Sequence, residues 1–127
     1  MSVDARARYA ESHEYARLDG KELVVGISDH AQAELGDIVF VELPAAGKTF
    51  AKGQIFGTIE SVKAASDLYM PVTGTVLAVN DSLQADPALV NREPYEGGWL
   101  LKVAPANAGE MDSLLDAAAY AKLAGEA

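Results

Sequence analysis

The chain contains no cysteine among its 127 residues, which excludes disulfide bonds, thiolate zinc sites and cysteine nucleophiles. It is also poor in basic residues, because 10 Lys and Arg stand against 19 Asp and Glu and give a net charge of −9. An acidic chain without a basic stripe is repelled by phosphate groups, so no nucleic-acid partner is expected. The charge fits partners with basic docking faces, and solubility alone explains it equally well.

Long hydrophobic runs are absent as well. No uninterrupted apolar stretch approaches the about 20 residues of a membrane helix, so no membrane partner is expected. The first six residues lack the apolar core of a secretory signal, and no Arg- and Ser-rich presequence follows Met1. These features favour a cytoplasmic protein of bacteria, with the mitochondrial matrix after processing as the alternative. Half of the residues are nevertheless apolar, and residues 1–127 suit a single domain.

Short apolar and β-branched runs separated by turn residues predict a mainly β chain. Residues 1–11 read as a lead-in without periodicity. Strands are expected within 14–27 around a turn at Asp19-Gly20, and then at 37–43, within 45–79 and at 99–103. A short helix is expected over 29–35, because Ser28 or Asp29 can cap its first amides and Gly36 suits its end.

A second helix is predicted over residues 107–125. Asn107 and Glu110 have the spacing of a capping box, and Gly125 suits the end of the helix. An apolar stripe runs along this segment and comprises Met111, Leu114, Leu115 and Ala118. We expect this stripe to pack against the β core.

Residues 60–67 are a candidate hairpin tip. The stretch contains no Gly, Pro or Asn, so local propensity predicts no turn there, and only the flanking strands indicate one. Two similar segments, which begin at Gly47 and Gly74, bracket it from both sides. Lys63 lies near its middle. From the residues alone, a lysine between Glu60 and Asp67 is usually a solvated charge.

A series of motifs runs from about Tyr9 to Tyr120, nearly the whole chain. The motifs are Ser12-His13-Glu14-Tyr15, Gly26-Ile27-Ser28-Asp29-His30-Ala31-Gln32, Leu35-Gly36-Asp37-Ile38-Val39-Phe40-Val41-Glu42-Leu43-Pro44, Glu60-Ser61-Val62-Lys63-Ala64, Pro71-Val72-Thr73-Gly74, Asn91-Arg92-Glu93-Pro94-Tyr95 and Gly98-Trp99-Leu100. In this series the chain resembles the H protein of the glycine cleavage system, a family of lipoyl carriers. The motif around Lys63 is the most specific of them.

The resemblance implies a lipoyl/biotinyl-type barrel-sandwich hybrid. Lys63 matches the family's attachment lysine, whose side-chain nitrogen carries lipoate through an amide. Glu60, Gly47 and Gly74 match positions that the family uses for recognition by lipoylating enzymes, although both glycines could simply permit tight turns.

The resemblance also implies carriage rather than catalysis, by a monomer without an active site of its own. The family takes an aminomethyl group from glycine after a pyridoxal-phosphate glycine decarboxylase (P protein) has acted. It delivers the group to a folate-dependent aminomethyltransferase (T protein), and dihydrolipoamide dehydrogenase (L protein) reoxidises the dithiol. Ser12, Glu14 and Asp67 match the polar groups of the cleft that shelters the loaded arm, where carboxylates suit a charged amine.

Alternatives remain open at this point. An H-like protein could act mainly as a lipoate relay to other enzymes. A biotin carrier is disfavoured, because Lys63 does not lie between methionines. A small hydrolase would use His13 or His30 with a neighbouring acid, but no serine motif and no metal-ligand spacing accompanies them, so packed or surface histidines and no metal site are expected.

Two positions depart from the family pattern. Tyr15 stands where the family commonly has Trp, and it keeps an aromatic body with a polar tip. Met70 stands where a small residue usually precedes the proline, which adds bulk near the base of the expected hairpin.

Overall fold

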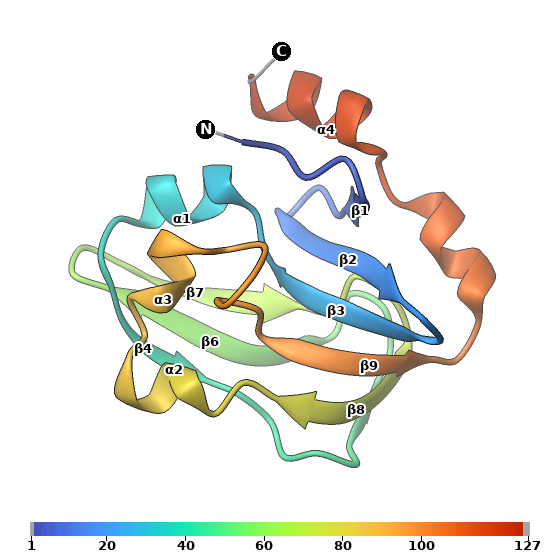
Figure 1. Cartoon of the computed structure of the whole chain (residues 1–127), viewed down its shortest axis with the longest axis horizontal. Helices are drawn as coiled ribbons and strands as arrows, with labels where there is room; N and C mark the ends of the chain where they lie inside the picture. Colours follow the sequence, from blue (N-terminus) through green and yellow to red (C-terminus); the bar gives the residue numbers. More distant parts are fainter. Residues whose placement is uncertain (1, 126–127) are drawn as a thin grey trace.

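Two antiparallel sheets form the body of the molecule (Figure 1), and the computed structural model describes residues 2–125. The larger sheet has the strand order β1-β2-β3-β9-β8-β5, and the smaller has the order β4-β6-β7. The strands are β1 (Ala7–Tyr9), β2 (Glu14–Asp19), β3 (Glu22–Ile27), β4 (Ile38–Glu42), β5 (Thr49–Phe50), β6 (Ile55–Ser61), β7 (Ala65–Tyr69), β8 (Gly74–Val79) and β9 (Leu101–Pro105). The fold class is therefore mainly β, as predicted.

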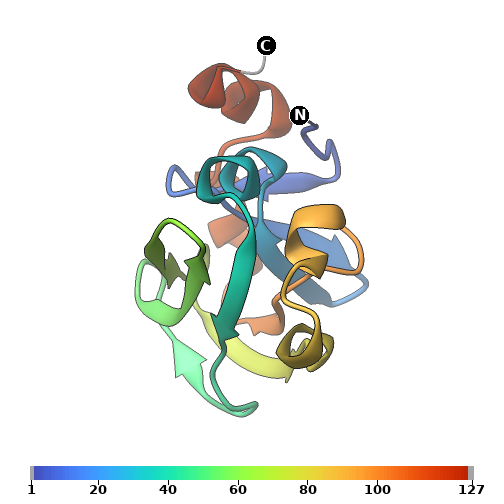
Figure 2. The ribbon, with the colours of Figure 1, turned by 90° about the vertical axis from the view of Figure 1, so that its left-hand side faces the viewer.

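The helical segments lie at the ends and edges of the sheets. They are α1 (Asp29–Leu35), α2 (Ser82–Ala85), α3 (Leu89–Arg92), the 3-10 helix η1 (Ala108–Ser113) and α4 (Ala117–Ala124). Figure 2 shows α1 and β4 between the β6–β7 hairpin on one side and α2 and α3 on the other. Within residues 2–125, no helix is long and apolar enough to cross a membrane.

Local interactions explain the β2–β3 hairpin and both ends of α1. β2 and β3 pair around Gly20, whose φ of +66° is the positive value that the turn needs. The predicted cap of α1 is confirmed, because Ser28 Oγ accepts a hydrogen bond from the Ala31 amide at 3.1 Å. Gly36 ends α1 with φ +81° and donates its amide to Gln32 O at 3.0 Å.

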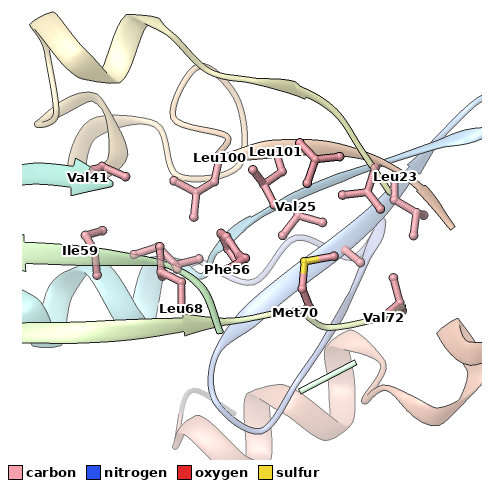
Figure 3. Close-up of a cluster of buried hydrophobic side chains, with 14 of the residues drawn as sticks. Leu23, Val25, Val41, Phe56, Ile59, Leu68, Met70, Val72, Leu100 and Leu101 are labelled. Atoms are coloured by element: carbon pink, nitrogen blue, oxygen red, sulfur yellow. The ribbon is translucent and has the colours of Figure 1, made fainter. Parts of the chain in front are cut away.

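The core lies between the two sheets. Phe56 and Leu68 of the smaller sheet face Val25 and Leu101 of the larger one (Figure 3), and all four are at most 4% exposed. Met70, one of the two departures from the family pattern, is 1% exposed within this cluster. Its bulk therefore fills the core between the sheets, where a flexible thioether adapts to an irregular space.

The predicted helix over 107–125 is wrong in its extent. The chain forms η1 and α4 instead, and Leu114 between them has extended backbone with φ −86° and ψ 159°. Leu115 pairs with Tyr9 through two backbone hydrogen bonds of 2.8 Å, which draws the chain out of any helix. The same pairing uses β1, so the segment 1–11 contains a strand that sequence patterns did not indicate.

Capping side chains at the C-terminal segment also act differently from the expected capping box. Asn107 accepts from the Gly109 amide at 2.9 Å, whereas Glu110 accepts from the Thr73 amide at 2.7 Å. A new helix begins after Asp116, whose side chain accepts from the Ala119 amide at 2.8 Å. The C-terminal segment still packs on the body, because the Tyr120 ring stacks on Tyr9 at 4.2 Å.

Candidate functional site

The β6–β7 hairpin carries Lys63 at its tip. β6 ends at Ser61, β7 begins at Ala65, and Glu60 lies opposite Ala65 across the pair. The residues from Val62 to Ala64 are exposed, so the lysine is accessible. The sequence-based prediction of a hairpin tip at this place is confirmed.

Ser61 explains how a tight turn forms here without Gly, Pro or Asn. Its hydroxyl accepts hydrogen bonds from the amides of Lys63 at 3.3 Å and Ala64 at 3.1 Å. Its own amide donates to Ala64 O at 2.7 Å. Serine can replace a backbone turn in this way, since its side chain satisfies local amides. The Val62 amide donates to Asp37 O at 2.9 Å and thereby ties the tip to the start of β4.

The Lys63 side chain lies back against the end of α1. A β-carbon at Gly36 would come within 3.3 Å of Lys63 Cε. Gly36 thus meets two requirements at once, a positive φ and room for the lysine stem. The helix that ends at this glycine also forms one wall of a cavity.

A cavity of about 270 Å³ opens between α1, the β1–β2 turn and β7. It is lined by Ser12, His13, Glu14, Ile27, Ala31, Glu34, Leu35, Ile59, Ser66, Asp67 and Leu68. The fold therefore brings Ser12, Glu14 and Asp67 to one cavity, although Asp67 is far from the other two in sequence. The hairpin that carries Lys63 supplies the Asp67 side of it.

Glu14 is a buried carboxylate, with 2% of its surface exposed. The Ser12 hydroxyl donates to its Oε1, and the Tyr69 amide donates to its Oε2 at 3.0 Å. Burial raises the pKa of Glu14, and both of these hydrogen bonds oppose that shift. Asp67 is exposed on β7. The cavity therefore offers an oriented, desolvated carboxyl group and an exposed one to a cationic or hydrogen-bonding guest.

Comparison with known proteins agrees with this arrangement. The family model described as "Glycine cleavage H-protein" matches residues 7–127. The chain belongs to the glycine cleavage H-protein family. It is 56% identical over 126 residues to "Glycine cleavage system H protein 2" of Pseudomonas putida, which covers 98% of both chains.

Further relatives extend this picture. The chain is 50% identical over 120 residues to the glycine cleavage system H protein of Bacteroides fragilis, covering 94% of this chain and 95% of the other. The crystal structure of a glycine cleavage system H protein from Mycobacterium marinum superposes with a TM-score of 0.89 at 37% identity, over 97% of this chain and 99% of that one. Membership of the H-protein family supports a role as a lipoyl carrier and a barrel-sandwich fold.

The three positions expected to serve recognition by lipoylating enzymes do not gather in one place. Glu60 is exposed on β6 beside the tip, whereas Gly47 and Gly74 belong to the region of β5 and β8 in the other sheet. Gly47 has φ +94°, and a β-carbon at Gly74 would lie 2.5 Å from Val103 Cγ1. Both glycines therefore have a structural reason to be glycine, whatever an H-protein partner reads from them.

Tyr15, at the position of the usual H-protein tryptophan, is fully buried. Its hydroxyl donates to Pro94 O at 2.6 Å, so the polar tip is satisfied. A β-carbon at Gly26 would lie 2.6 Å from the Tyr15 hydroxyl oxygen, and the glycine thus makes room for the ring. Tyr15 keeps a packing role.

The two histidines of this H-protein family member come together beside the cavity, which sequence patterns did not indicate. Their ring centroids lie 5.1 Å apart. The acids next to them in sequence have other partners, since Glu14 accepts from Ser12 and Tyr69, and Asp29 accepts from Ser2 and Gln32. The one signal in the sequence was the four-residue spacing of His30 and Glu34 on the predicted helix.

Proposed function

We propose that the chain is the lipoyl carrier of a glycine cleavage system, with lipoate attached to Lys63. The observation that carries this proposal is the position of Lys63 at an exposed hairpin tip. Its stem lies against α1, the helix that lines the cavity containing Glu14. The residues fit the group, because a modifying enzyme can reach the tip and a long arm can fold back along α1.

When attached, lipoate would supply the sulfur that takes up the aminomethyl group of glycine, and its two sulfurs would cycle between disulfide and dithiol. The chain supplies position and shelter. Glu14 and Asp67 would hold the amine end of the loaded arm, and Ser12 would keep Glu14 oriented through its hydrogen bond. Apolar walls from Ile27, Leu35 and Leu68 would limit the access of water.

The proposed partners are those of a shuttle. Glycine decarboxylase would load the arm, the folate-dependent aminomethyltransferase would unload it, and dihydrolipoamide dehydrogenase would reoxidise it. Lipoylating enzymes would recognise Glu60, with Gly47 and Gly74 shaping the surface nearby. We further propose that residues 1–127 act as one monomeric carrier domain in the bacterial cytoplasm, without catalysis of their own.

Glycine–bicarbonate exchange with the glycine decarboxylase partner tests the shuttle. The lipoylated chain should stimulate exchange, and the Lys63→Arg variant, which keeps the charge and the length of the stem, should not. A chain shown by mass to be lipoylated that gives no stimulation would contradict the shuttle and favour the lipoate relay. Hydrolytic activity that survives Lys63→Arg but is lost when His13 or His30 is substituted would favour a small hydrolase instead.

A further inference from the structure

We propose that His13, His30 and Glu34 form a binding site for a divalent first-row transition metal ion, with Zn²⁺ as the best match. One possible donor atom from each of the three residues lies within 4.8 Å of the other two. Two imidazoles and one carboxylate are a known zinc donor set, and a site with three protein ligands leaves a fourth position open.

The three side chains come from two elements that face each other. His30 and Glu34 lie one turn apart on α1, with His30 Nε2 2.5 Å from Glu34 Oε1. Ligands four residues apart on a helix share one face, as in helical zinc motifs. Donor atoms on one tetrahedral ion lie about 3.3 Å apart when the zinc–nitrogen distance is about 2.0 Å. The donor atoms, which lie within 4.8 Å of one another, therefore need to approach by no more than about 1.5 Å to share one ion.

His13 is held in place by its surroundings. It ends the turn between β1 and β2 with φ +79°, and it is the only residue other than glycine with a positive φ among residues 2–125. Its Nδ1 lies 2.6 Å from the Tyr120 hydroxyl, which in turn lies 2.6 Å from Ser28 Oγ. Because Nδ1 is engaged by Tyr120, Nε2 is the nitrogen that His13 offers to an ion. A hydrogen bond to the second ring nitrogen commonly orients a ligating histidine.

Charge also favours an ion at this place. Glu34 adds a negative charge beside the two rings, and imidazole suits first-row metals such as zinc and nickel. The chain has no cysteine and no other histidine, so no other imidazole or thiolate competes for the ion.

The site shares a wall with the cavity. His13 and Glu34 both line it, as do Glu14 and Asp67. The open fourth position on the ion would therefore take water or a small ligand from the cavity. This inference does not depend on lipoylation, because all of its ligands belong to the polypeptide.

Calorimetric titration of the full, unlipoylated chain with ZnCl₂ at neutral pH tests the proposal. We expect one Zn²⁺ per chain, with binding lost in His30→Ala and in His13→Asn. Asparagine is chosen at position 13 because it tolerates a positive φ better than other non-glycine residues. Tyr120→Phe, which removes only the orienting hydroxyl, should weaken binding by about 10-fold or more.

A matched control separates Zn²⁺ binding at a defined site from attraction of the ion by the negative charge of the whole chain. Glu34→Gln should weaken Zn²⁺ binding strongly, whereas Glu11→Gln, an equal charge change on an exposed turn residue, should not. Co²⁺ should broaden the imidazole proton signals of both histidines in the NMR spectrum at substoichiometric amounts, and circular dichroism would verify the fold of each variant. The proposal is overturned if folded His13→Asn or His30→Ala binds Zn²⁺ as well as the wild type, or if the wild type binds none.

Discussion

At the scale of single residues, burial sets the behaviour of Glu14. Its carboxyl group receives hydrogen bonds from Ser12 and Tyr69, yet burial still raises its pKa. A buried carboxylate is costly unless it is satisfied, and here two donors reduce the cost. Its ionised form is therefore expected to lower the stability of the fold, which fits the proposed role of Glu14 in holding a guest in the cavity.

The pH dependence of stability tests this account through Glu14→Gln. Below the ordinary carboxyl pKa of 4.5, Glu14 is protonated in the folded and unfolded states alike and carries no penalty. As the pH rises through that value and on through the raised folded pKa, ionisation favours the unfolded state. The free energy of unfolding of Glu14→Gln should therefore increase relative to the wild type between about pH 4 and pH 7.

Urea unfolding at about pH 4 and about pH 7 measures the difference in the free energy of unfolding between Glu14→Gln and the wild type. Glutamine can accept from the Tyr69 amide and donate to the Ser12 oxygen, so no buried polar group is left unpaired. The exposed Glu42→Gln variant controls for the loss of one negative charge. A difference between Glu14→Gln and the wild type that shrinks with rising pH would contradict the burial argument.

Single residues also show what local sequence signals miss. Resemblance to a family identifies Lys63 and its neighbours, whereas propensity alone predicts no turn there. The reason is that Ser61 supplies through its hydroxyl what Gly or Asn would supply through the backbone. Local sequence signals also do not indicate that His13 lies beside His30, because this contact depends on the packing of a turn against a helix.

At the scale of elements, close strand packing constrains the larger sheet at Gly74. A β-carbon there would lie 2.5 Å from Val103 Cγ1 and 2.6 Å from Ala104 O on the neighbouring strand β9. Gly47 has open space around it and is constrained only by its φ of +94°. The two glycines therefore have different physical reasons behind them.

Alanine substitutions separate the two reasons. Gly74→Ala should lower the free energy of unfolding by about 1–3 kcal/mol, because overpacking forces strands apart. Gly47→Ala should cost about 1–2 kcal/mol from backbone strain alone. Chemical denaturation measures both effects. Unchanged stability in Gly74→Ala would contradict the close approach, and a stable variant with poor lipoylation would indicate direct recognition of that position.

Local sequence signals predict some element boundaries and miss others. The β2–β3 hairpin and α1 follow from local signals at Gly20, Ser28 and Gly36. The C-terminal segment does not, since the pairing of Leu115 with Tyr9 joins opposite ends of the chain and overrides its helical pattern. Such a long-range strand contact leaves no local trace in the sequence.

At the scale of the whole molecule, charge governs encounters. The net charge of −9 becomes −10 when an amide removes the positive charge of Lys63. If the chain is the proposed shuttle, its acidic surface would steer it towards basic docking faces on its partners, and steering acts over a Debye length of about 10 Å at 0.1 M salt.

Ionic strength tests whether the charge serves docking. The concentration of lipoylated chain that half-saturates glycine–bicarbonate exchange should rise by about 10-fold between low and physiological salt. Exchange measured over a NaCl series gives the half-saturating concentration at each salt concentration. The exchange rate at a saturating concentration of the chain controls for effects of salt on the partner's catalysis. A half-saturating concentration that is independent of salt would leave solubility as the explanation of the charge.

Intact-mass measurement tests most directly whether Lys63 alone carries lipoate. Chain expressed in bacteria supplied with lipoate should show the mass of one lipoyl group, and Lys63→Arg should show none. The control variant Lys52→Arg, which replaces another exposed lysine, should still gain the full mass of one lipoyl group. An unmodified wild type under these conditions, or a lipoyl group that persists in Lys63→Arg, would contradict the account.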